Sequence, residues 1–90
     1  MAELSDLEFR ILDSLYFVEP FENILAEVGA PENVVAAELR NLIARRWVQA
    51  MRFDPTANDY VSSAIFDTHD LRAYRYLATK EGLLVHSGRR

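Results

Sequence analysis

Apolar residues recur at helical spacing in the first segment of the chain, at Leu7, Ile11, Leu12, Leu15 and Val18. Ser5 and Glu8 have the spacing of a capping box, in which each side chain accepts a hydrogen bond from the backbone N–H of the other residue. Pro20 closes the pattern, because proline disfavours the helical conformation of the residue before it. The pattern therefore predicts an amphipathic helix over residues 5–18.

Two more helical patterns follow, separated by a short turn. The first covers residues 21–28, and Gly29 is suited to end it because glycine readily adopts the left-handed conformation of a helix C-cap. Pro31 suits the first position of the next helix, which is predicted to run over residues 31–46. Its buried face is expected to consist of Val35, Leu39, Leu42 and Ile43. Its exposed face is then left to Glu32, Asn33, Ala36, Ala37, Arg40, Asn41 and Ala44.

The periodicity changes from helical to alternating after the third helix. A strand is predicted from Trp47 or Val48 to Phe53, and Asp54-Pro55 ends it with residues typical of turns. The next region is polar and acidic except at 60–61 and 64–66, which fit either a short strand or a turn of helix.

Residues 73–79 alternate again between larger and smaller or polar side chains. This alternation predicts a returning strand, so that residues 47–79 would form a hairpin or wing. A helix capped by Thr68 is the alternative, because Leu71, Tyr74 and Leu77 also share a helical face.

Several segments then stand in a familiar order: Leu39-Arg-Asn-Leu42, Arg45-Arg-Trp-Val48, an acidic loop, Tyr74 to Leu77 and Thr79-Lys-Glu-Gly82. This order resembles bacterial winged-helix transcriptional regulators of the MarR and PadR kind, over most of the chain. The resemblance implies an α+β, mostly α, winged helix-turn-helix with a three-helix core and a β-hairpin wing. It also implies a short last helix over residues 79–86, which Thr79 caps and where Gly82 allows close packing.

The composition excludes several classes of protein and of active site. Ninety residues, half of them apolar, fit one domain over residues 1–90. The absence of cysteine excludes disulfides, thiolate catalysis and cysteine zinc sites. The N-terminus lacks the basic and apolar pattern of a signal peptide, and no apolar run has membrane-spanning length. We therefore expect a cytoplasmic protein that does not enter membranes, and nothing in the sequence indicates a cofactor.

The net charge of -4 and the pI near 5.0 mean that DNA would have to be bound through a local basic patch. The basic candidates are Arg40, Arg45, Arg46 and Arg52, which Arg72 and Arg75 would extend from the wing. The neutral candidates on the third helix are Asn33, Ala36, Ala37 and Asn41. The alternative interpretation is that these arginines are solvated charges paired with nearby acids. Acids in the wing, at Asp54, Asp59, Asp67 and Asp70, would repel phosphates.

Two functional hypotheses follow from these residues. The first is a DNA-binding transcriptional regulator that acts as a homodimer, since one short helix reads too little DNA, with the N-terminal helix and the segment after Gly82 as dimer surfaces. The second is a winged helix that binds another protein through its third helix. Enzymatic activity is not expected: Asp67-x-His69-Asp70 is a weak metal-like cluster, and His86 has no serine nucleophile pattern near it in the sequence.

Overall fold

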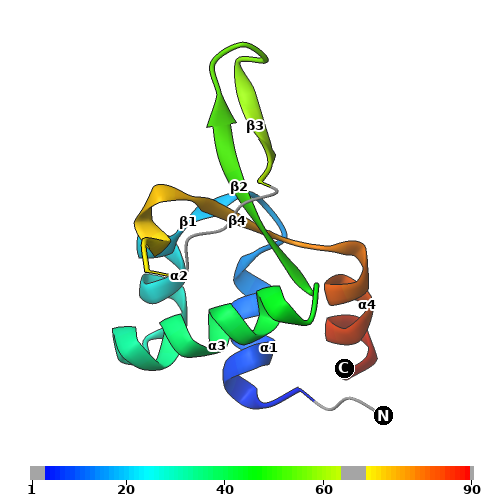
Figure 1. The fold of residues 1–90 in the computed structure, drawn as a ribbon. Helices are drawn as coiled ribbons and strands as arrows, with labels where there is room; N and C mark the ends of the chain where they lie inside the picture. The colour runs from blue at the N-terminus through cyan, green and yellow to red at the C-terminus, as the bar shows by residue number, and fades with distance from the viewer. Residues whose placement is uncertain (1–3, 64–68, 90) are drawn as a thin grey trace.

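The computed structural model describes residues 4–63 and 69–89. Within these residues the chain forms four α-helices and a four-stranded antiparallel sheet, which confirms the α+β class. In Figure 1 the helices gather on one side of the sheet, and one long hairpin projects away from them. The elements are α1 (Asp6–Ser14), β1 (Glu19–Pro20), α2 (Phe21–Val28), α3 (Glu32–Ala44), β2 (Val48–Asp54), β3 (Asp59–Ser62), the 3-10 helix η1 (Leu71–Ala73), β4 (Arg75–Ala78) and α4 (Lys80–Arg89).

The first helix begins as predicted but ends earlier. Ser5 Oγ accepts from the Glu8 N–H at 3.1 Å and Glu8 Oε1 accepts from the Ser5 N–H at 2.8 Å, so the capping box is confirmed. The helix ends at Ser14 rather than at residue 18. The reason is tertiary, because the carbonyl of Leu15 accepts a hydrogen bond at 2.9 Å from the N–H of Ala78. The chain then continues into β1, which the sequence did not predict.

The second and third helices agree with the sequence to within two residues. Gly29 has φ 71° and caps α2 in the left-handed conformation, as predicted. Pro31 is the N-cap of α3 rather than its first residue. The helix ends at Ala44 because Arg46 turns the backbone to φ 65° and the N–H of Trp47 bonds back to the carbonyl of Leu42 at 3.0 Å.

The sheet has the strand order β1-β4-β2-β3. The strand β3 pairs with the outer half of β2, from Met51 opposite Ser62 to Asp54 opposite Asp59. On its other side β2 pairs with β4, from Val48 opposite Ala78 to Met51 opposite Arg75. The returning strand is therefore confirmed at Arg75–Ala78, and the helical alternative for this segment is wrong. Residues 60–61 lie in β3, whereas 64–66 and the proposed cap Thr68 fall outside the described residues.

The core lies between the helices and one face of the sheet. Val48, Ala50, Tyr76 and Ala78 are the buried sheet residues, and they alternate with less buried neighbours. From the helices they meet Ile11, Leu12, Leu15, Phe21, Ile24, Val35, Leu39 and Leu42. The alternation of β2 continues into the hairpin at residues 52 and 54, and in Figure 1 the described helices lie away from the hairpin.

The last helix is attached to the residues that follow α3. Thr79 Oγ1 accepts from the N–H of Gly82 at 3.0 Å and donates to the carbonyl of Arg46 at 2.7 Å. A Cβ atom on Gly82 would stand 2.0 Å from the carbonyl oxygen of Trp47. Both sequence expectations for this region, the Thr79 cap and close packing at Gly82, are thus confirmed, although α4 extends to residue 89 rather than 86.

Candidate functional site

The third helix presents a row of small, uncharged residues to solvent. Asn33, Ala37, Asn41 and Ala44 are all exposed and follow one another at spacings of three or four residues, so they share one side of the helix. The exposed Arg40 follows Ala37 by three residues and precedes Ala44 by four, so it borders the same side. We call these four residues the outer row. It spans about three helical turns, or roughly 16 Å. Three of the four neutral candidates predicted from the sequence, Asn33, Ala37 and Asn41, belong to the outer row.

Ala36, the fourth neutral candidate, is not on this surface. It is only 7% exposed and belongs to the core cluster together with Leu71 of η1. It stands one turn after Glu32, on the side of α3 that the segment around Arg72 approaches. The expectation that Ala36 lies on the exposed face is therefore wrong, because η1 packs against this side of the helix.

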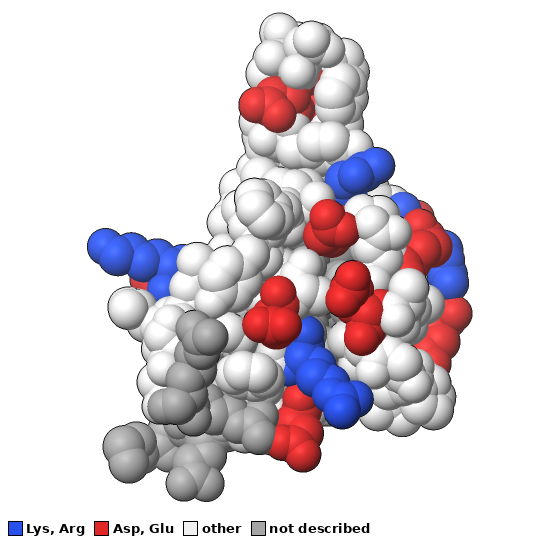
Figure 2. Space-filling view, turned by 180° about the vertical axis from the view of Figure 1, so that it is seen from behind, with Lys and Arg blue, Asp and Glu red and all other residues white. Residues whose placement is uncertain are grey.

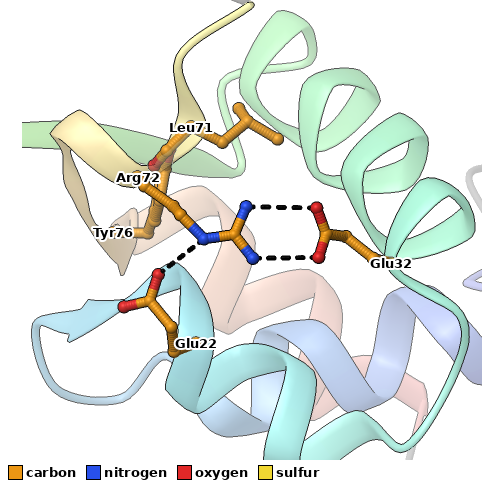
Figure 3. Close-up of polar contacts among 5 residues, drawn as sticks. All are labelled: Glu22, Glu32, Leu71, Arg72 and Tyr76. Carbon is orange, nitrogen blue, oxygen red and sulfur yellow. Dashed lines mark hydrogen bonds and ion pairs between the residues drawn. The ribbon is translucent and has the colours of Figure 1, made fainter.

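Arg72 ties η1 to the beginnings of two helices (Figure 3). Its Nη1 and Nη2 atoms donate to the two carboxylate oxygens of Glu32, at 3.1 and 2.9 Å, and its Nε lies 3.1 Å from Oε1 of Glu22. The guanidinium also stands 5.3 Å from the ring centroid of Phe21. The hydrogen bond from Arg72 lowers the pKa of Glu32. We call Arg72, Glu22 and Glu32 the arginine clamp.

The clamp changes what this end of the molecule can bind. The prediction that Arg72 extends the wing is wrong, because η1 folds back onto the helices instead of following the hairpin. Glu22 and Glu32 both lie in the first turn of their helices, where negative charge is favourable. A phosphate approaching these helix ends would meet two carboxylates and an arginine that is already bound.

Arg45 is also engaged within the molecule. Its Nη1 atom is 3.0 Å from Oε2 of the buried Glu8, and its guanidinium stands 5.1 Å from the ring of Trp47. Glu38, half-buried on α3, shares a hydrogen bond with Glu8. Burial and the charge of Glu8 raise the pKa of Glu38. Burial opposes ionisation of Glu8 as well, but hydrogen bonds from Ser5 and Glu38 and the charge of Arg45 lower the pKa of Glu8.

The other nominated arginines are distributed over several elements. Arg40, Arg46 and Arg52 are exposed, on α3, in the turn after it and on β2. Arg75 is half-buried on β4 with its guanidinium 5.1 Å from the ring of Tyr60, so it lies at the base of the hairpin. Figure 2 shows the molecule from behind, and the described basic and acidic side chains on that face are intermixed rather than gathered by sign.

The hairpin carries acidic side chains, whereas a wing that binds DNA needs basic side chains to contact phosphates. Asp54 and Asp59 are paired opposite each other at its outer end. Asp67 lies outside the described residues, and Asp70 precedes η1. Among residues 4–63 and 69–89 no group of three side chains is arranged to hold a metal ion.

A second cluster joins α1 to α4 and was missed by the sequence analysis. His86 is 2% exposed, and its Nδ1 lies 3.0 Å from the hydroxyl of Tyr16 while its Nε2 lies 3.1 Å from Oδ1 of Asp13. The imidazole stacks on the ring of Phe9, with centroids 4.2 Å apart and planes inclined by 15°. No local pattern could have indicated this cluster, because His86 is 70 residues from Tyr16 and 73 residues from Asp13 in the chain.

Comparison of the chain with protein-family models, with curated proteins and with solved structures found no match. In the part of the chain that the structure describes, no helix combines the length and the apolar character needed to cross a bilayer.

Proposed function

We propose that this chain is a winged-helix module that binds another protein through the outer row of α3. The fold assignment is supported by the succession of elements: α2, the Gly29 turn and α3 follow one another as in a helix-turn-helix, and the β2–β3 hairpin comes next in the chain and projects away from the helices (Figure 1). The choice of a protein partner rests on charge and side-chain size at α3.

The observation that carries the proposal is the neutrality of the outer row, which is bordered by one exposed arginine, Arg40, while Arg45 and Arg72 are already paired with glutamates. A DNA-reading helix needs side chains that bond to base edges and basic neighbours that neutralise phosphates. Here Asn33 and Asn41 are the only hydrogen-bonding side chains of the outer row, and the arginine clamp occupies Arg72. Arg45 is held by Glu8 in the same way.

The same row suits contact with a helix of another protein. Alanine and asparagine are short, so a partner helix can approach to an interaxial distance of about 8 Å. Val34, the residue after Asn33 on α3, is an exposed apolar residue that would add to the buried area. An amphipathic helix with an apolar face is therefore the partner chemistry that we propose, in the helix-in-groove manner.

DNA binding as a transcriptional regulator is the second candidate, and one observation favours it. Arg46 occupies a left-handed backbone position, φ 65°, where glycine would be less strained. The chain thus keeps a long basic side chain at a conformational cost of roughly 1 kcal/mol. Together with the exposed Arg40 and Arg52, this arginine could contact phosphates.

Both candidate functions include the association of two copies of this chain. We expect a homodimer formed through α1 and α4, because Phe17 after α1 and Leu84 on α4 are the most exposed large apolar residues among those that the structure describes, at 78% and 64%. A cytoplasmic setting is part of the proposal as well.

Fluorescence anisotropy with mixed-sequence duplex DNA separates the two functions. The protein-binding proposal expects no titratable binding at 50 mM or 150 mM salt. Binding that weakens steeply with salt and disappears in the Arg40→Ala/Arg46→Ala variant would replace it with the DNA-binding candidate.

Site-specific photo-crosslinking tests the protein partner directly. A photoreactive residue placed at Ala37 should give a discrete protein adduct in cells that produce the chain, whereas the same residue at the exposed Ala26 of α2 should not. Adding Glu at Ala44 in the Ala37 probe should abolish the adduct, because a buried carboxylate opposes helix packing. Equal labelling from both positions would contradict a docking role for the outer row.

A further inference from the structure

The cluster of Asp13, His86 and Tyr16 is a relay of hydrogen bonds that ends at solvent. Asp13 and Tyr16 come from the end of α1 and the residues after it, and His86 comes from α4. The histidine is buried between them and stacked on Phe9, so its ring is held in one orientation. Tyr16 is 45% exposed, which leaves its side chain open to approach.

The chemistry of the three groups assigns the protons. An ionised Asp13 can only accept, so Nε2 of a neutral His86 carries the ring proton and donates it over 3.1 Å. Nδ1 is then a lone pair that accepts from the hydroxyl of Tyr16 over 3.0 Å. A carboxylate that fixes the tautomer of a histidine, which in turn accepts from a hydroxyl, is the arrangement that activates oxygen nucleophiles.

We propose that Tyr16 is an acyl-acceptor residue, with His86 as its general base and Asp13 as the residue that positions His86. The substrate class is an activated carboxylic ester or thioester. This activity does not depend on what α3 binds, since the cluster is built from α1 and α4.

The step is a single acyl transfer that balances without a further reactant. The phenolic oxygen of Tyr16 forms a bond to the carbonyl carbon, and the bond from that carbon to the leaving oxygen or sulfur breaks. The hydroxyl proton moves to Nδ1 of His86 and from there to the leaving group. The products are an O-acyl tyrosine and an alcohol or thiol, and the histidine returns to its neutral form.

The test is acetylation by p-nitrophenyl acetate, with peptide mass spectrometry to measure the rate at each tyrosine of the intact chain. Tyr16 should be acetylated at least about ten-fold faster than in the His86→Gln variant, because a positioned general base contributes about a hundred-fold or more. Tyr60 on the hairpin is the internal reference, and its rate should be the same in both proteins.

The pH profile supplies a readout that a purely structural role of His86 would not alter. In the unmodified chain the Tyr16 rate should reach a plateau as the pH rises, whereas an unassisted phenol reacts in proportion to its ionised fraction and its rate rises about ten-fold per pH unit. Asp13→Asn, a change at an exposed residue, should lower the plateau several-fold and preserve the fold.

Two results would overturn the proposal. One is an equal Tyr16 rate in the original chain and in His86→Gln. The other, which needs no variant and therefore holds even if His86→Gln does not fold, is a Tyr16 rate that rises without a plateau in parallel with Tyr60. The relay would then be only a link between α1 and α4.

Discussion

Gly82 allows α4 to approach the backbone of Trp47 more closely than any other residue would. Replacing it with alanine would place the new Cβ 2.0 Å from the Trp47 carbonyl oxygen, and a backbone atom cannot turn aside as a side chain can. We expect Gly82→Ala to lower the free energy of unfolding by about 2–3 kcal/mol, as overpacking does. Urea denaturation followed by circular dichroism measures the loss.

Gly88, on the same helix, is the matched control. A Cβ atom there would meet nothing within 4 Å, so Gly88→Ala should be neutral or stabilising by up to about 1 kcal/mol through helix propensity. Equal losses in the two variants would show that helix propensity, rather than the contact with Trp47, decides the outcome.

Glu38 makes stability depend on pH through a carboxyl pair. Its pKa is raised above the ordinary value of 4.5 by burial and by Glu8, so ionising it in the folded state costs stability as the pH rises. Glu38→Gln removes that charge and keeps a polar group beside Glu8. We expect the variant to be more stable at pH 7 by roughly 0.5–1 kcal/mol.

The sign of this effect fixes its pH range. Below about pH 4.5 Glu38 is protonated in both the folded and the unfolded chain, so the advantage of the variant should vanish there. Thermal unfolding curves between pH 4 and pH 8 measure the difference. A variant that is less stable than the original chain at pH 7 would mean that the carboxylate of Glu38 stabilises the fold.

At the scale of elements, Thr79 determines where β4 ends and α4 begins. Its hydroxyl both caps α4 and bonds to the carbonyl of Arg46, the residue that closes α3. Thr79→Ala should therefore cost about 1–2 kcal/mol of unfolding free energy, whereas Thr79→Ser should retain most of it because serine keeps the hydroxyl. Chemical denaturation of both variants gives the comparison, and a similar loss in both would point to the methyl group instead.

The sequence predicted the elements whose signals are local. The helix α2 was placed correctly because Pro20 and Gly29 bracket it, and the Ser5 capping box fixed the start of α1. The end of α1 was misplaced because it depends on a hydrogen bond from Ala78, far along the chain. Local periodicity carries no information about such a partner.

For the candidate site, too, the sequence predicted some residue positions correctly and others wrongly. Helical spacing correctly predicted that Asn33, Ala37 and Asn41 are exposed. It wrongly placed Ala36 on the same face, because spacing within α3 carries no information about η1, whose Leu71 belongs to the same core cluster as Ala36. The position of Arg72 depends on Glu32, forty residues away, and the relay at His86 depends on an even longer separation. Side chains brought together by topology are the part that sequence reasoning could not supply.

At the scale of the whole molecule, the two large apolar residues that the structure shows to be most exposed are the ones that a dimer would bury. Phe17 follows α1 and Leu84 lies on α4, the two elements through which we expect a dimer. Phe17→Ser/Leu84→Ser should shift sedimentation velocity toward the monomer and change the unfolding free energy of the monomer by no more than about 0.5 kcal/mol per site, since neither residue is buried. Phe53→Ser on the hairpin is the control and should leave the sedimentation coefficient unaltered. A chain that is monomeric before substitution would contradict the dimer.

The arginine clamp also has an evolutionary consequence. Glutamate and glutamine codons differ by one base, so two single-base changes would turn Glu22 and Glu32 into neutral residues and release Arg72 at the ends of two helices, where anions are attracted. Adaptation between a surface that repels nucleic acid and one that attracts it would then require no change in the hydrophobic core. Descendants of one such scaffold can diverge in their partners while their backbones stay superimposable.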